Sequence, residues 1–184
     1  MTARAHLRAA TAEAHERVDG LFTGYDLSDP AQYGDFLVAQ AAAFLPAEAA
    51  VSGGDIGTIL PDWTARLRSA LLLADLGELG RTAPPLLPAP SLTSPAALLG
   101  AAYVLEGSRL GGAYLRRAVP KELPVRFLAA PQPRGAWRDF LAMLDRQLTG
   151  DAALNGATQS ALAMFRLFEE AVLLHGKPKG DGSG

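Results

Sequence analysis

The chain has 184 residues, of which 49% are hydrophobic, with a formal net charge of −2, three histidines and no cysteine. This length suits one domain with a core of its own. The missing cysteine excludes disulfides, thiolate metal sites and thiol nucleophiles, the three histidines exclude a His-rich metal cage, and the scattered basic residues argue against a nucleic-acid surface.

The spacing of the apolar residues predicts an all-α protein, because they recur at intervals of three and four and β-branched residues are scarce. We expect one domain over residues 1–175 and a disordered tail, rich in Gly and Lys, over residues 176–184. The N-terminus is charged from Arg4 onward, and proline and glycine break the longest apolar runs. We therefore expect a cytoplasmic protein without a signal peptide or a membrane-spanning segment.

The first predicted helix, over residues 3–22, has a polar stripe beside its apolar stripe. His15 follows Arg8 by about two turns, which is roughly 10 Å along the helix axis. These two side chains could hold the centre and the acidic edge of a large planar ligand. Alternatively, His15 is a partly buried polar residue bonded to its own helix. The apolar stripe consists of Leu7, Ala10, Ala14, Val18 and Leu21, and the polar stripe of Arg8, Thr11, His15 and Asp19.

The second predicted helix begins with a strong start signal, the N-cap Asp29 followed by Pro30. It runs over residues 30–51, and Pro46 should kink it or split it in two. Further helices are expected over residues 63–73, 95–119, 134–148 and 151–175, with a loose turn over 75–80 and a proline-rich loop over 81–95.

The central helix, over residues 95–119, has glycines at positions 107, 111 and 112. Each interior glycine costs about 1 kcal/mol relative to alanine, so three of them require a reason. One explanation is that they allow two helices to pack closely. The other is that they bend the helix and bring bare backbone against a flat ligand. The residues alone favour neither explanation.

Several enzyme classes are excluded by missing motifs. The chain has no phosphate-binding P-loop, no Gly-x-Ser-x-Gly elbow and no Glu-x-x-His pair of the kind that di-iron bundles require. What remains is one histidine with a cation two turns before it, and one glycine-containing helix. An imidazole can ligate iron on one face of a macrocycle while such a helix covers the other face. A single axial ligand would favour oxygen chemistry over electron transfer.

Two separated motifs resemble the haem (heme) oxygenases. Leu-Arg-Ala-Ala-Thr-Ala-Glu-Ala-His, at residues 7–15, is similar to the proximal helix of that family. Tyr-Val-Leu-Glu-Gly-Ser-Arg-Leu-Gly-Gly, at residues 103–112, is similar to its distal helix, in the form typical of bacterial members associated with bacteriophytochromes. Leu-Phe-Glu-Glu at residues 167–170 matches the last helix of the family. The resemblance spans almost the whole chain up to His175.

The resemblance implies an all-α, single-domain haem oxygenase-like bundle, with haem b between the first helix and a glycine-kinked distal helix. His15 would be the iron ligand, and Gly107 and Ser108 would lie at the reacting face. Asp19 would orient the region around His15, Arg8 would bind a propionate, and Arg138 is a candidate for a second propionate contact. The cofactor-binding residues implied in this way are Arg8, Thr11, Asp19, Gly111, Gly112, Arg138, Ala161, Leu162 and Phe168.

The activity implied by the resemblance is the opening of haem to biliverdin, with release of CO and iron. Haem would be both cofactor and substrate, and an external reductase or ferredoxin would donate the electrons. A bacteriophytochrome would be a candidate partner that receives the biliverdin, and neither nucleic acid nor a membrane would be a partner.

The chain departs from the mammalian pattern at Ser108, where mammalian-type members have an aspartate that organises a water network. A hydroxyl can hold a water but lacks the charge of a carboxylate. This difference motivates a second hypothesis, a haem-binding protein for storage, transfer or sensing that does not turn haem over. A third hypothesis is a helical interaction domain without haem, in which His15 and the glycines serve packing alone.

Overall fold

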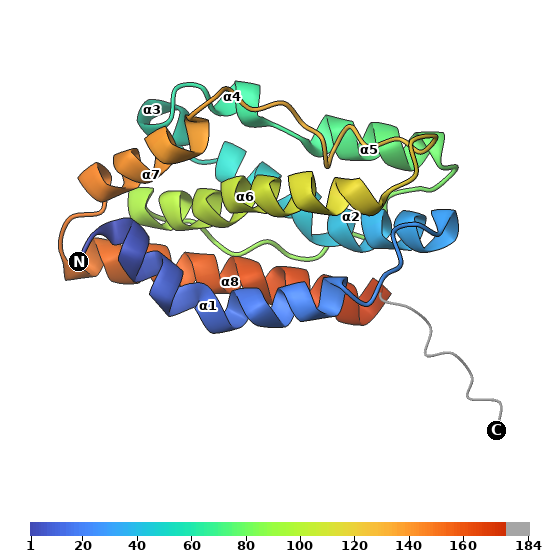
Figure 1. Ribbon diagram of the computed structural model, residues 1–184. Helices are drawn as coiled ribbons and strands as arrows, with labels where there is room; N and C mark the ends of the chain where they lie inside the picture. The colour runs from blue at the N-terminus through green and yellow to red at the C-terminus, as the bar shows by residue number, and fades with distance from the viewer. Residues whose placement is uncertain (176–184) are drawn as a thin grey trace.

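Helices α6 (Pro95–Leu115) and α8 (Asp151–His175) pack along each other and organise the bundle. The computed structural model describes residues 1–175, which form helices and no strand, so the all-α prediction is confirmed (Figure 1). The close approach of α6 and α8 depends on Gly100, where a Cβ atom would collide with the Ala157 carbonyl oxygen. Ser160 Oγ also donates a hydrogen bond to Ala97 O at 2.7 Å. The predicted disordered tail, residues 176–184, lies outside the described residues.

Helix α1 (Ala3–Phe22) packs against α8 and has the predicted bounds. It begins at the N-cap Thr2, whose side chain accepts from Ala5 N. The predicted apolar stripe is largely confirmed, but Ala10 is exposed and Thr11 is buried in its place. Thr11 can be buried because its hydroxyl donates to Leu7 O at 2.8 Å.

Helix α2 (Pro30–Ser52) lies at the centre of the bundle and contacts α8, α5 and α6. It starts at Asp29 as predicted, but it continues unbroken through Pro46, so the expected split is wrong. Packing on three sides outweighs the single backbone hydrogen bond that Pro46 removes. Among the described helices, α2 is also long and apolar enough to cross a membrane, contrary to the expectation from its sequence. About 67% of that stretch is buried inside the protein.

The chain between α2 and α6 differs most from the prediction. Instead of one helix over residues 63–73 and a loose turn, it forms α3 (Ile56–Ile59), α4 (Trp63–Arg66) and α5 (Ser69–Glu78). The Glu48 carboxylate of α2 accepts hydrogen bonds from the backbone N–H groups of Arg68 and Ser69, at 2.7 and 2.9 Å. Because the group that starts α5 comes from another helix, the local sequence does not reveal where α5 begins.

The end of α6 and the start of α7 (Ala136–Gln147) are shaped by turns. Helix α6 runs through all three glycines to Leu115 and is followed by the 3₁₀ turn η1 (Arg116–Ala118), whereas a helix to residue 119 was expected. The segment between η1 and α7 is fixed by the buried carboxylate of Asp75, which accepts from Phe127 N at 2.8 Å. Helix α7 follows Gly135, whose φ of 82° favours glycine.

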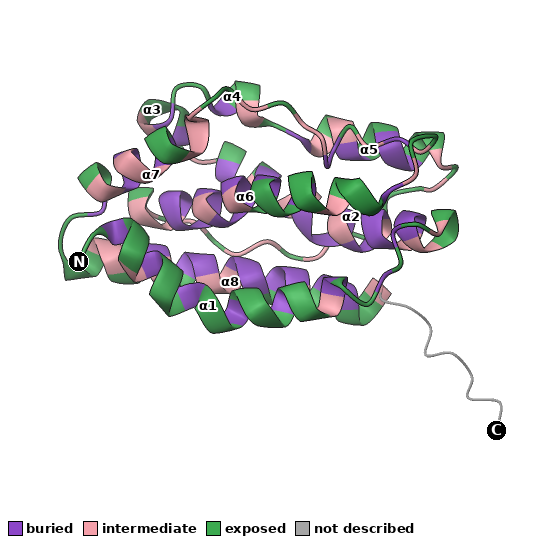
Figure 2. Cartoon of the chain, in the orientation of Figure 1, coloured by how far each residue is buried: buried purple, intermediate pink, exposed green. Residues whose placement is uncertain are grey.

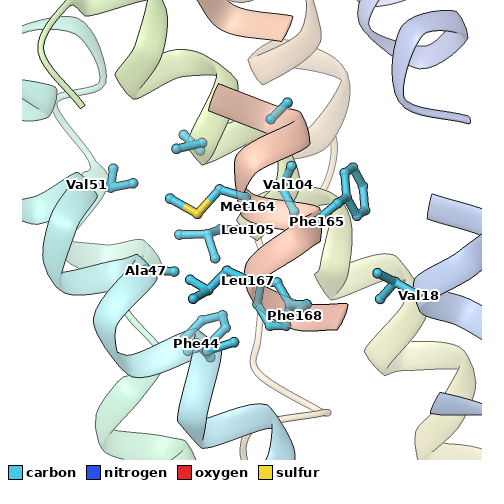
Figure 3. Packing of buried hydrophobic residues seen from close by; sticks show 14 of the residues in the cluster. Val18, Phe44, Ala47, Val51, Val104, Leu105, Met164, Phe165, Leu167 and Phe168 are labelled. Atoms are coloured by element: carbon cyan, nitrogen blue, oxygen red, sulfur yellow. The ribbon is translucent and has the colours of Figure 1, made fainter. Parts of the chain in front are cut away.

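The apolar core lies where α2, α6 and α8 meet (Figure 3). From α8, Met164 and Leu167 point towards α2, and Phe165 points towards α1. The outer face of α1 and the later part of α6 remain exposed (Figure 2). The two helices that carry the sequence motifs therefore share α8 as support and have surfaces free for a ligand.

Candidate functional site

Helices α1 and α6 pack against α8 but scarcely against each other. The two helices approach each other at Tyr103 of α6. Its hydroxyl lies within hydrogen-bonding distance of Thr11 on α1 and is close to the positive charge of Arg8. Burial raises the pKa of the Tyr103 hydroxyl, and the Thr11 hydrogen bond and the Arg8 charge act in the opposite direction. Arg8 and Thr11, two of the predicted site residues, therefore lie near Tyr103, the first residue of the distal motif.

The side chain of His15 is 60% exposed and is held on two sides. Its Nδ1 lies 3.4 Å from Oδ2 of Asp19, one turn later on α1. Its ring meets Phe165 of α8 edge-on, with 5.7 Å between the ring centres. Within residues 1–175 the other ring nitrogen, Nε2, has no hydrogen-bond partner. The imidazole is thus oriented by its own helix and by α8, with one nitrogen free.

The three glycines of the distal motif have different surroundings. A Cβ atom at Gly111 would meet nothing within 4 Å, and one at Gly107 would meet only the Trp137 ring edge at 3.6 Å. At Gly112 it would make ordinary contact with Leu128, at 3.4 Å or more. Close helix packing therefore explains Gly100 but not Gly107 or Gly111. Gly111 presents bare helix backbone to open space, and Gly107 presents it beside the Trp137 ring.

An aromatic stack extends from the distal motif to α7. The Tyr103 and Trp137 rings are stacked with 5.9 Å between their centres, and Trp137 stacks in turn on Phe140 at 5.8 Å. Trp137 also borders the open side of Gly107. Tyr103, Trp137 and Phe165 are not among the site residues expected from the sequence, although Tyr103 lies within the distal motif. Apolar stripes alone do not distinguish a pocket wall from a core face.

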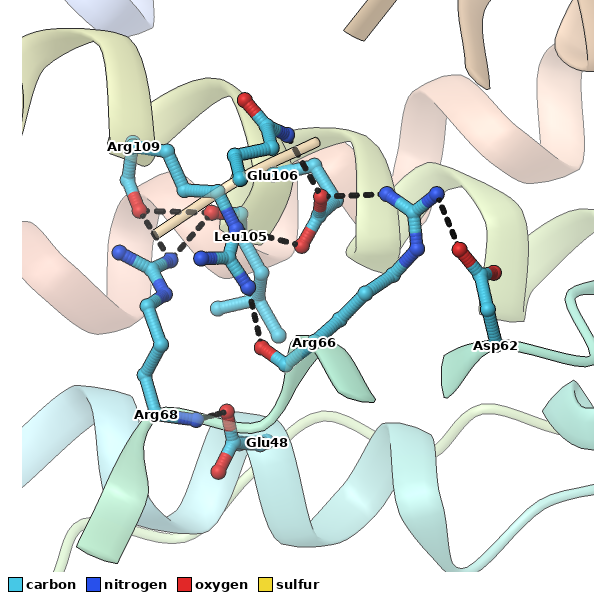
Figure 4. Close-up of polar contacts among 9 residues, drawn as sticks. Glu48, Asp62, Arg66, Arg68, Leu105, Glu106 and Arg109 are labelled. Atoms are coloured by element: carbon cyan, nitrogen blue, oxygen red, sulfur yellow. Dashed lines mark hydrogen bonds and ion pairs between the residues drawn. The ribbon is translucent and has the colours of Figure 1, made fainter. Parts of the chain in front are cut away.

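Ser108 has a partner that sequence reasoning missed. Its Oγ donates to Leu105 O at 2.7 Å and accepts from Nη2 of Arg68 at 2.8 Å. The same Nη2 donates to Leu105 O at 2.6 Å (Figure 4). Arg68 is 3% exposed, and its guanidinium lies over the rings of Phe44 and Phe127. The Ser108 hydroxyl is therefore joined to a buried cation.

Burial and, to a smaller extent, the positive charge of nearby Arg109 lower the pKa of Arg68 to about 9, although Glu106 and Glu48 act in the opposite direction. Glu106 forms ion pairs with Arg66 at 2.7 Å and with Arg109 at 3.1 Å (Figure 4). Arg109 also donates to the Arg66 carbonyl. These contacts fix α6 to the segment between α4 and α5, so the backbone of the distal motif is held from the side opposite its open glycines.

The remaining predicted residues fall into two groups. Arg8 is exposed, and Arg138 is 79% exposed with its guanidinium paired to Asp139 of the same helix. Ala161 and Phe168 are buried in the core, and Leu162 is half-buried. Within the described part of the chain, no group of three or more His, Asp or Glu could hold a metal ion. Iron held at His15 would therefore depend on a prosthetic group for its other ligands.

No protein-family profile matches the chain. A protein of Xanthomonas campestris pv. campestris (strain 8004) named haem oxygenase is 34% identical over 122 residues, which cover 63% of this chain and 73% of that protein. The NO- and CO-bound haem oxygenase of Neisseria meningitidis has a similar fold, with a TM-score of 0.80 and 23% identity over 98% of this chain and 95% of that one. Haem oxygenase from Leptospira interrogans also has a similar fold, with a TM-score of 0.68 and 20% identity over 92% of this chain and 100% of that one.

Proposed function

The chain belongs to the haem oxygenase family of oxidoreductases, and on this basis we propose that it opens haem b to biliverdin with release of CO and iron. The observation that carries the proposal is the pairing of His15, oriented with one ring nitrogen free, with two glycines on α6: Gly111 faces open space, and Gly107 borders only the Trp137 ring. A flat ring needs an axial ligand on one face and close, side-chain-free backbone on the other.

On the proximal side, we assign the iron to Nε2 of His15. Asp19 binds Nδ1, which fixes the ring orientation and raises the basicity of the imidazole. Phe165 supports the ring from α8. When bound, haem supplies both the iron at which oxygen is activated and the ring that is opened.

On the distal side, Gly107 and Gly111 allow the α6 backbone to approach the ligand, and Ser108 holds the proton network. Because the Ser108 hydroxyl already donates to Leu105 O, it can only accept a hydrogen bond from a water. Arg68 replaces the negative charge of the mammalian aspartate with a positive one. The charge that organises protons at this site therefore has the opposite sign.

The rest of the assignment follows the family. Arg8, whose charge acts on nearby Tyr103, would bind one propionate. Arg138 is a candidate for the other, after release from Asp139. The functional unit would comprise residues 1–175, act in the cytoplasm, and take electrons from a reductase or ferredoxin. A bacteriophytochrome would receive the biliverdin.

A haem carrier without turnover is the second candidate. The observation in its favour is again Ser108, whose hydroxyl proton is committed to Leu105 O and whose oxygen accepts from Arg68 rather than bonding a carboxylate. Such a protein would use the same pocket for storage, transfer or sensing. Haem binding is common to both candidates, and biliverdin formation distinguishes them.

The test is a haem titration followed by a single turnover with a chemical reductant, observed by absorption spectroscopy. His15→Ala is compared with His6→Ala, a matched change on the same helix outside the site. We expect a Soret band that decays to a biliverdin spectrum, unchanged in His6→Ala and lost or shifted in His15→Ala. A stable Soret band without biliverdin would support the carrier. Failure to bind one haem per chain would exclude both.

A further inference from the structure

A cavity of about 230 Å³ lies on a second flank of α6, formed with the segment between η1 and α7. Arg109, Ala113 and Arg116 line it from α6 and η1. Arg109 and Ala113 each lie two residues from an open glycine, so they point about 200° away around the helix. The cavity therefore lies mainly on another flank of α6 than the face proposed for haem, and Arg68, which lines the cavity, also binds Ser108 of that face. Its other lining residues include Arg68, Phe127, Leu128 and Gln132, and none is acidic.

The guanidinium of Arg68 reaches this cavity without a carboxylate partner. Nη2 is bonded to two neutral oxygens, and the buried Nε has no hydrogen-bond partner among residues 1–175. Glu48, the carboxylate beside Arg68, bonds its backbone N–H rather than its guanidinium. Glu106 and Glu48 act on this buried charge only through space, and a carbonyl, a hydroxyl and two aromatic rings compensate for its burial in part.

The neighbouring charges leave the cavity positive. The Glu106 carboxylate is shared by Arg66, Arg109 and the Gln132 amide, so it is not available to Arg68. Arg116 is exposed beside the cavity. Burial first and the charge of Arg109 second lower the pKa of Arg68, and the opposing effect of Glu106 and Glu48 does not cancel them.

We propose that this cavity binds a small oxyanion, a carboxylate or a phosphate, with Arg68 at its inner end and Arg116 at its rim. Guanidinium groups suit such ligands because their parallel N–H groups match two oxygens at once. The volume is below the roughly 300–1,000 Å³ of pockets for drug-sized molecules, which limits the ligand to a small anion. The apolar wall of Phe127 and Leu128 would strengthen the ion pairs by excluding water.

The test uses the haem-free protein, so it does not depend on the proposed oxygenase activity. Inorganic phosphate and, in a second arm, succinate are titrated by calorimetry at constant ionic strength set with chloride. We expect one saturable site per chain. The anion that binds more tightly shows whether the natural ligand is a phosphate or a carboxylate. The absence of saturable binding of either anion would overturn the proposal.

Two neighbouring arginines provide a matched pair of variants. Arg116→Ala removes a cation that lines the cavity, whereas Arg117→Ala removes an exposed cation that does not. Loss of one charged contact should weaken anion binding about three- to tenfold in Arg116→Ala and leave it unchanged in Arg117→Ala. Equal affinities in the two variants would overturn the site. Arg68→Met, if it folds, should abolish binding.

Discussion

At the scale of single residues, His15 depends on the carboxylate that holds its Nδ1. Replacing Asp19 by Asn keeps the shape but removes the negative charge, so the imidazole becomes a weaker ligand. We expect haem affinity to fall about tenfold, within the range usual for partners of metal-bound histidines. The measurement is the dissociation constant from a haem titration.

Glu16→Gln is the control for Asp19→Asn, because Glu16 is an exposed acidic residue of the same helix that is not paired with His15. Its haem affinity should match that of the unmodified chain. Equal losses in the two variants would mean that net charge, rather than orientation of His15, determines binding.

At the scale of elements, the glycines of α6 divide into two kinds. Gly100→Ala introduces a methyl group against Ala157 and should destabilise the haem-free protein by about 1–3 kcal/mol. Gly111→Ala adds a methyl group in open space and should stabilise the haem-free helix by about 1 kcal/mol. Urea unfolding measures both changes.

Gly111→Ala, the variant expected to be more stable without haem, should bind haem more weakly than the unmodified chain. The Gly111 methyl group would stand where the ring is proposed to lie, and overpacking of about 1–3 kcal/mol would weaken haem binding at least about fivefold. If Gly111→Ala bound haem as tightly as the unmodified chain, the proposed position of the ring against α6 would be wrong.

The start of α5 gives a second prediction at this scale. Glu48→Gln leaves the buried N–H groups of Arg68 and Ser69 with a weaker acceptor, so we expect a loss of about 1–3 kcal/mol in the free energy of unfolding. Glu78→Gln breaks a surface ion pair with Arg126 and should cost less than about 1 kcal/mol. Similar losses in the two variants would contradict this role of Glu48.

At the scale of the whole molecule, stability should decrease in alkali. Burial raises the pKa of Tyr25, Tyr33 and Tyr103 in the folded protein. Above about pH 10 the unfolded chain therefore binds fewer protons than the folded one, and the free energy of unfolding falls as pH rises. Arg68 acts oppositely, because its folded pKa of about 9 lies below its ordinary value, but three tyrosines outweigh it.

Urea unfolding from about pH 8 to about pH 11 tests this pH dependence. Tyr33→Phe removes one buried phenol, together with its hydrogen bond to Pro124 O, and should make the fall with pH shallower. Tyr114→Phe, at an exposed position, should leave the slope unchanged. A slope that is the same in both variants would exclude Tyr33 as a contributor.

The sequence predicted the start of a helix correctly where the capping side chain lies next to that helix in the chain. Asp29 and Ser94 cap α2 and α6 with their own side chains, and both helices begin where the sequence indicates. The break before α5 depends on Glu48, 20 residues away, and the partner of Ser108 is Arg68, 40 residues away. Periodicity and capping rules contain no information on such pairs, so the fold class was predictable and the buried arginine was not.

The exposure of the later half of α6 should affect how fast its backbone amide hydrogens exchange with solvent. From Gly107 to Leu115 the helix contains three glycines, and only Arg109 and Gly112 are buried, so fewer packing contacts than in its first half oppose local opening. Its amides should exchange with solvent faster than those of residues 95–106, which are buried against α8. A ligand lying on this backbone would slow that exchange. Exchange rates in this half-helix would therefore report how full the pocket is, even for a ligand that has no colour.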